Sequence, residues 1–115
     1  MFERFDEVLS ERIGEGSIDN DQFSTLMDTL AHHNQICPAG QEVSLQLVCI
    51  AGESFIQENL VFLDKSQLLS SVGGYCTSGV MKQLPELQQS FESELKSRMH
   101  ALTSGELVYI LRMFS

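Results

Sequence analysis

Residues 14–27, GEGSIDNDQFSTLM, combine a glycine turn with acidic side chains, which is the chemistry of a calcium-binding loop. If Gly16 occupies the sixth position, where an EF-hand loop turns sharply, the loop begins at Glu11. Its third position is then Ile13, and its twelfth, which requires a bidentate glutamate, is Gln22. Because these ligands are missing, we expect a glycine-terminated helix followed by a capped one. A calcium-responsive, degenerate EF-hand-like module is kept as an alternative function.

A second group of possible metal ligands follows in the next helical stretch. Asp28 and His32 are four residues apart and would share one face of a helix, as two ligands of one metal must. His33 would point about 100° away from that face, and Cys37 lies beyond the expected helix end. Since no second ligand cluster accompanies them, we expect no metal site. The histidines are interpreted as solvent-exposed residues near a helix C-terminus, where positive charge is favourable.

The stretch SSVGGYCTSG, residues 70–79, has the glycine content of a phosphate-binding loop. It contains neither GxxxxGK[ST] nor GxGxxG, and Lys82 is not placed for either motif. We therefore expect a flexible joint between two helices. Cys37, Cys49 and Cys76 have no CxxC spacing, and Cys76 has no obvious general base, so we expect reduced thiols without a catalytic role. No catalytic constellation is present, and the sequence predicts neither an enzyme nor a cofactor.

The composition is that of one folded domain over residues 1–115, with 43% apolar and 20% charged residues. No apolar run approaches the roughly 18 residues of a membrane span. The net charge of −9 is unevenly distributed: residues 1–64 hold twelve acids and two bases (−10), whereas residues 65–115 hold four acids and five bases (+1). Nucleic-acid binding depends on Lys and Arg, so it is not expected for residues 1–64. We expect a reducing, intracellular location, cytoplasmic or in an organellar matrix.

Apolar residues recur at helical spacing along most of the chain, so we expect an all-α fold, a helical bundle or short α-solenoid of about five to six helices built from helical-pair repeats. The segment 43–50 has strand propensity, but a helix is preferred because its apolar stripe continues to Phe55. Gly73 and Gly74 predict a frayed or bent helix end. The expected helices are 2–13, one capped by Asp19 or Asn20, about 38–58 opened by Pro38, Asp64 to Tyr75, one opened by Pro85, and one from the capping box Thr103–Glu106 to Phe114.

Three helix starts can be superimposed on one another. They are IDNDQFSTLMDTL from Ile18, LDKSQLLSSVGGY from Leu63 and LTSGELVYILRMF from Leu102. Each has a capping residue, a Gln or Glu three residues later, and apolar residues at the fourth and eighth positions after the cap. An amphipathic helix precedes each copy, as in stacked helical pairs. Ordinary capped amphipathic helices share these features, so a plain helical bundle stays open as the alternative.

This unit resembles the helical-pair repeats of octotricopeptide and heptatricopeptide proteins and of FAST-kinase-like proteins. Those repeats pair a helix of the FxxFxxxLxxRI kind, as at residues 2–13, with a Leu-Thr/Asp-x-x-Glu/Gln-Leu helix. The resemblance covers most of the chain and implies a stack of helical pairs in an organellar protein of RNA metabolism. This chain is shorter and more acidic and shows no RAP-type C-terminal domain, which leaves a scaffold role in an organellar assembly.

The last helix is apolar around much of its circumference, and such helices are normally buried. We expect the third copy to lack its second helix, so that a protein partner or a second copy of the chain covers this one. The function we expect is that of a non-catalytic protein-binding or scaffold subunit, and an RNA-associated repeat protein is the alternative. The expected partner-binding residues are Leu107, Val108, Ile110, Leu111, Met113 and Phe114. The RNA-binding residues of the alternative are Lys82, Lys96, Arg98 and Arg112.

Overall fold

The structure, a computed structural model, describes residues 2–38, 40 and 43–114. Within these residues it contains six α-helices and three short 3₁₀ helices and no strand, which confirms the all-α class. The α-helices are α1 (Phe2–Gly14), α2 (Asn20–Ile36), α3 (Gln46–Asn59), α4 (Lys65–Thr77), α5 (Pro85–Ser97) and α6 (Ser104–Phe114). The 3₁₀ helices are η1 (Leu60–Phe62), η2 (Met81–Gln83) and η3 (Met99–Ala101).

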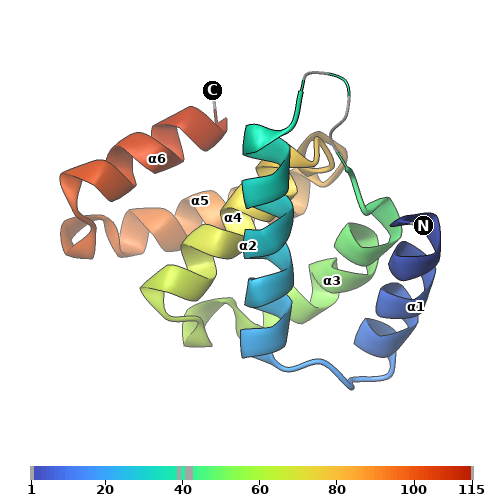
Figure 1. Cartoon of the computed structure of the whole chain (residues 1–115). Coiled ribbons are helices and arrows are strands. Elements are labelled where there is room, and N and C mark those ends of the chain that lie inside the picture. Colours follow the sequence, from blue (N-terminus) through green and yellow to red (C-terminus); the bar gives the residue numbers. More distant parts are fainter. Residues whose placement is uncertain (1, 39, 41–42, 115) are drawn as a thin grey trace.

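The helices form two rows of neighbours (Figure 1). In one row α1 packs on α3 and α3 contacts α5, and in the other α2 packs on α4 and α4 contacts α6. In Figure 1, α1 and α3 run downwards, whereas α2 and α4 run upwards. Helices α5 and α6 extend these two rows by one helix each. For reference we call α1–α2, α3–α4 and α5–α6 the three consecutive pairs. That they are copies of one repeated unit, and that the third copy lacks its second helix, stay predictions.

Each of the three helix starts in the second row has the expected capping box. Asp19 accepts a hydrogen bond from the Gln22 backbone N–H at 2.8 Å, and the Asp19 N–H donates to the Gln22 side chain at 3.1 Å. Asp64 and Gln67 repeat this exchange at 2.8 and 3.0 Å. At the start of α6, the Thr103 N–H donates to Glu106 at 2.7 Å, which together with Lys65 lowers the pKa of that carboxyl. These local signals placed the helix starts correctly because each cap uses only residues within one turn.

The start of α3 differs from the prediction. Pro38 lies beyond the end of α2 and opens no helix, and residues 43–45 are irregular, so that α3 begins only at Gln46. Leu45, at the cap position, is left-handed with φ 44° and makes no side-chain cap. Instead, Asp6 of α1 accepts the backbone N–H groups of Leu47 and Val48 at 3.0 and 2.8 Å. The cap of α3 is thus tertiary, and it joins α1 to α3.

The prediction of a frayed or bent end at Gly73 and Gly74 is also wrong, as is that of a flexible joint over residues 70–79. Helix α4 continues through both glycines to Thr77, and both are buried. A Cβ atom on Gly74 would lie 2.7 Å from the Met27 sulfur and 2.9 Å from the Met27 carbonyl oxygen. A Cβ atom on Gly73 would clash with the Tyr109 hydroxyl. These glycines let α2 and α6 approach α4 closely.

Tyr75 anchors the core between the two rows. Its side chain is fully buried, and its hydroxyl donates a hydrogen bond of 2.8 Å to the Cys49 carbonyl oxygen of α3. Its ring lies 5.9 Å from the ring of Phe91 on α5. Burial, with a smaller contribution from Cys49, raises the pKa of Tyr75 well above its usual range. A single residue of α4 therefore contacts two helices of the other row.

A first prediction concerns the crossing of α2 and α4. Replacing Gly74→Ala should lower the free energy of unfolding by about 1–3 kcal/mol, because the added methyl group meets the Met27 backbone and not only its flexible side chain. Urea denaturation followed by circular dichroism measures this. Gly105→Ala is the matched control, since the nearest atom to a Cβ there is 4.0 Å away. Equal stability of Gly74→Ala and the parent chain would contradict the close crossing.

A second prediction concerns the tertiary cap. Asp6→Ala should lower the free energy of unfolding by about 0.5–2 kcal/mol, the range for loss of a helix N-cap. The reason is that two N–H groups at the start of α3 lose their acceptor. Hydrogen exchange should accelerate more at the backbone amides of Leu47 and Val48 than at those of α4. Glu11→Ala removes an exposed acid from the same helix and should leave both readouts unchanged. Unaltered exchange at Leu47 and Val48 in Asp6→Ala would show that Asp6 does not cap α3.

Candidate functional site

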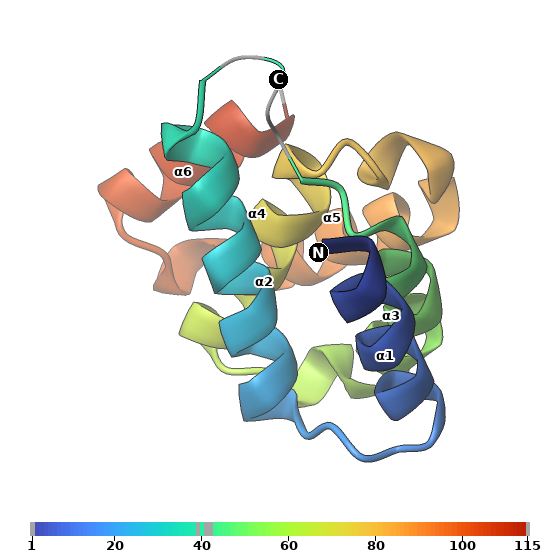
Figure 2. The same cartoon turned by 45° about the vertical axis from the view of Figure 1, so that its right-hand side comes forward.

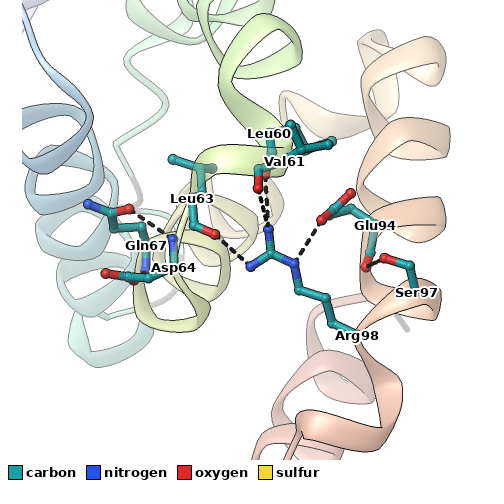
Figure 3. A network of polar contacts seen from close by, with 8 residues as sticks. All are labelled: Leu60, Val61, Leu63, Asp64, Gln67, Glu94, Ser97 and Arg98. Atoms are coloured by element: carbon teal, nitrogen blue, oxygen red, sulfur yellow. Dashed lines mark hydrogen bonds and ion pairs between the residues drawn. The ribbon is translucent and has the colours of Figure 1, made fainter.

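Arg98 fastens the end of α5 to the turn between α3 and α4 (Figure 3). Its guanidinium donates to the carbonyl oxygens of Leu63 at 2.6 Å, Leu60 at 3.2 Å and Val61 at 3.4 Å. It also pairs with Glu94 at 2.7 Å. Leu60 and Val61 belong to η1 and Leu63 follows it, so these bonds give the carbonyl groups at the end of this short helix a side-chain donor. The side chain is only 20% exposed, so this cation acts inside the fold.

The other bases expected for RNA binding do not lie on one element. Lys82 is exposed in η2, just before α5, and Lys96 is exposed in the last turn of α5. The helical rise places Lys96 about 16 Å along the α5 axis from Pro85, and Lys82 precedes that helix. Arg112 belongs to α6. With Arg98 turned towards backbone carbonyls, the structure does not gather the four side chains into one basic patch.

Helix α6 exposes residues whose counterparts, counted from the cap, are core residues of α2 and α4. At the fourth position after the cap, Phe23 and Leu68 are 1% and 0% exposed, whereas Leu107 is 38% exposed. At the eighth position, Met27 and Val72 are 0% exposed and Leu111 is 70% exposed. Val108, which follows Leu107, is 56% exposed and extends the same surface. We call Leu107, Val108 and Leu111 the outer face of α6.

The other three residues expected to bind a partner point inwards. Ile110, Met113 and Phe114 are half-buried and pack against the core. On the same side, Tyr109 lies against Gly73 of α4, and burial raises the pKa of its hydroxyl. The pairing of Lys65 with Glu106 at 3.2 Å joins the starts of α4 and α6. The six expected interface residues thus divide into an inner half that attaches α6 and the outer face.

A second apolar surface, which the sequence reasoning missed, is a groove between α1 and α2. Two adjoining cavities of about 360 and 300 Å³ share Leu9 and Leu26 in their walls. Figure 2 shows the two helices at the front of the molecule. The remaining lining residues are Phe5, Thr29, Leu30, His33, Val43 and Leu45 in the larger cavity, and Arg12, Ser17, Ile18 and Gln22 in the smaller. We call this surface the α1–α2 groove.

A signal for this groove is present in the sequence. Helix α2 carries two apolar stripes, one with Phe23 and Met27 and another with Leu26 and Leu30. The first stripe is buried against α3 and α4, and the second lines the groove. Reciprocal hydrogen bonds of 2.8 Å between the Asn34 side chain and the Val43 backbone hold one wall in place.

A polar cleft lies between α4 and α6. Its volume is about 470 Å³, and its charged side chains include Lys65, Glu106 and Asp28. Lys65 pairs with Glu106, and the Ser70 hydroxyl lies 3.4 Å from the Asp28 carboxylate. Within the described part of the chain, every buried side-chain nitrogen and oxygen has a hydrogen-bond partner.

The thiols of Cys49 and Cys76 are poorly suited to nucleophilic chemistry. All three cysteines are free, with Cys49 buried and the other two half-buried. Burial raises the pKa of the Cys49 thiol to about 12, with Ser78 opposing the shift and Asp6 adding to it. Burial also raises the pKa of Cys76 to about 11. Thiols with such pKa values are almost entirely protonated near pH 7, and the thiol is not the reactive form.

The two sequence stretches considered for metals have other roles in the fold. Ile13 is buried, and the Gln22 side chain belongs to the capping box of α2. His32 is exposed as expected, whereas His33 is half-buried in the wall of the α1–α2 groove. Among the residues that the structure describes, no cluster of three or more His, Cys, Asp or Glu side chains is placed to hold a metal ion.

Comparison with known proteins adds no assignment. The chain matches no family model, no curated protein and no solved structure. The resemblance to octotricopeptide, heptatricopeptide and FAST-kinase-like repeats therefore stays a prediction. Across the described ranges, no helix combines the length and hydropathy needed to cross a membrane.

A third prediction separates the structural role of Arg98 from that of a simple charge. Arg98→Lys keeps the charge but loses the planar group that reaches several carbonyls, so it should lower the free energy of unfolding by about 1–3 kcal/mol. Lys96→Arg, an exchange at an exposed neighbour, should leave stability unchanged. Thermal denaturation of both variants measures the difference. A fully stable Arg98→Lys protein would show that charge alone accounts for this residue.

Proposed function

We propose that this protein is a non-catalytic assembly module that binds a protein partner through the outer face of α6. One observation carries the proposal: the fourth and eighth positions after the cap are fully buried in the first two units and exposed in the third. Phe23 and Met27 are covered by the pair that follows them, through Gly52 of α3 and Gly74 of α4. Leu107 and Leu111 hold the same positions, and a further helical surface stacked on α6 would bury them in the same way.

The arrangement of the rest of α6 supports an interface. Glu106, Tyr109 and Ile110 attach the helix to α4 and the core, so the outer face is presented on a fixed element. Burying a large aliphatic side chain completely contributes about 1.5–3 kcal/mol. Three partly exposed residues then supply roughly 3–5 kcal/mol on that scale, less than the roughly 8 kcal/mol of a micromolar complex. The partner must therefore contact more than these three side chains.

The fourth prediction tests the proposed function. Leu111→Glu should abolish assembly, because it places a charge on the most exposed residue of a surface that association desolvates. Size exclusion with light scattering, over a range of concentrations, should show the intact chain above monomer mass and the variant as a monomer. Phe62→Glu is the matched control, since Phe62 is 75% exposed but lies in η1.

The control should assemble as the intact chain does, and circular dichroism should show the same helix content in all three proteins. The proposal fails if the intact chain and Leu111→Glu are monomers of equal stability. In that case the outer face of α6 remains in contact with water and is not an interface.

A further inference from the structure

We propose that the outer face of α6 docks into the α1–α2 groove of a second copy of the same chain, giving a head-to-tail assembly. The inference rests on the proposed function, because it names the partner of the same α6 face. It also assigns a role to the groove. The proposed contact resembles one within the chain, the packing of α2 on α3 and α4.

In the contact within the chain, α2 packs on the α3–α4 pair. The Phe23 ring packs so closely on Gly52 of α3 that a Cβ atom there would be 2.6 Å from the ring. The centroids of the Phe23 and Phe55 rings are 5.2 Å apart. Met27 packs on Gly74 of α4 in the same way, because a Cβ atom on Gly74 would be 2.7 Å from the Met27 sulfur. Two residues of a second-row helix, at the fourth and eighth positions after its cap, thus fit between the two helices of the next pair. Leu107 and Leu111 are the corresponding residues of α6.

The α1–α2 groove is the counterpart of the surface that receives α2. Counted from the caps, Leu30 of α2 corresponds to Tyr75 of α4, and Thr29 corresponds to Gly74, the residue that meets Met27. Because Thr29 carries a side chain where α4 has a glycine, a helix in the groove must lie further from α2 than α2 lies from α4. Both Leu30 and Thr29 line the larger cavity. In the α3–α4 pair the equivalent space is filled by α2, whereas in the α1–α2 pair it is open. The α1–α2 pair thus has an open apolar groove, and α6 has the side chains, Leu107 and Leu111, that would pack into it.

The dimensions of the two surfaces agree. Helix α6 has 11 residues, which corresponds to about 16 Å. Along α2, the groove extends from Gln22 to His33, which is also about 16 Å. An exposed Phe5 at one end of the groove, 53% accessible, would add apolar contact beyond the cavities themselves. A helix laid along the groove would therefore be covered by α1 on one side and α2 on the other.

A second copy is required because one chain cannot make this contact with itself. In Figure 1, α1 and α6 lie on opposite sides of the molecule. Charge favours the same arrangement. The part that contains the groove, residues 1–64, carries −10, and residues 65–115 carry +1. Groove-to-groove pairing would bring two strongly acidic parts together, whereas head-to-tail contact brings the acidic part of one copy against the nearly neutral part of the next.

Symmetric pairing of two α6 helices is the competing arrangement, and it is less complete. Each copy would contribute only the three side chains of the outer face, and the α1–α2 groove would remain exposed in both copies. Stable interfaces bury about 800 Å² on each partner, which is more than one short stripe offers. A head-to-tail contact covers both apolar surfaces at once, and it repeats along a chain of molecules unless the rotation closes a ring.

The test is a complementation experiment with two full-length variants. The groove variant carries Phe5→Glu and Thr29→Glu, two exposed positions that line the cavity, and the α6 variant carries Leu111→Glu. Phe62→Glu is again the control for loss of an exposed aromatic residue. Light scattering should find each variant monomeric at concentrations where the intact chain and the control assemble. An equimolar mixture of the two variants should form a heterodimer and nothing larger, because only one intact interface can form.

The outcomes separate this inference from the proposed function. If the groove variant assembles as the intact chain does while Leu111→Glu does not, α6 is an interface but the groove is not its partner, and only this inference fails. If the mixture of variants remains monomeric, head-to-tail docking is likewise overturned. If the intact chain is a monomer at every concentration and is as stable as Leu111→Glu, this inference and the proposed function fail together. If Leu111→Glu assembles normally, both proposals fail together.

Discussion

The close crossing of α2 and α4 is the contact on which the rest of the structure depends. Met27 lies against Gly74 at a distance that leaves no room for a methyl group, and Gly52 accommodates Phe23 in the same way. Glycine weakens an isolated helix by about 1 kcal/mol, so its use inside α4 is compensated by packing that no larger residue would permit. Because α4 also contacts α6 and, through Tyr75, both α3 and α5, this crossing sets the positions of the remaining helices.

Side chains distant in sequence complete the helix ends and make the arrangement rigid. Asp6 caps α3 from α1, and Arg98 reaches from the end of α5 to the carbonyl groups between α3 and α4. Helix termini otherwise expose groups that require water, so these ties allow the ends to pack closely. Because the helices are held in place, the exposed side chains of the outer face of α6 lie on a fixed surface. A fixed surface loses little conformational entropy when a partner covers it.

Signals confined to one helical turn were sufficient to predict much of this fold. The three capping boxes and the first-turn proline of α5 located four helix starts, because every atom involved lies within a few residues. The start of α3 was predicted too early, since its cap, Asp6, lies 41 residues before Leu47. Gly73 and Gly74 were interpreted as flexible because helix propensity contains no information about a neighbouring helix. For the candidate site, apolar character identified α6, but which of its residues face outwards depends on packing against α4, and the α1–α2 groove depends on the spacing of two helices.

The α-helices of the described residues form two rows, with exposed apolar side chains on α6 and an apolar groove between α1 and α2. Coverage of the outer face of α6 by association is tested most directly by solvent paramagnetic relaxation of methyl groups in NMR, with a soluble paramagnetic agent, at low and high protein concentration. Strong relaxation is expected at Leu107 and Leu111 in the dilute protein and none at Leu68 and Val72, the buried residues at the same positions. At high concentration, Leu107 and Leu111 should become protected together with Leu9 and Leu26 of the groove. Protection of Leu107 and Leu111 in dilute protein that light scattering finds monomeric would contradict an exposed outer face, because these side chains would then be covered within one chain.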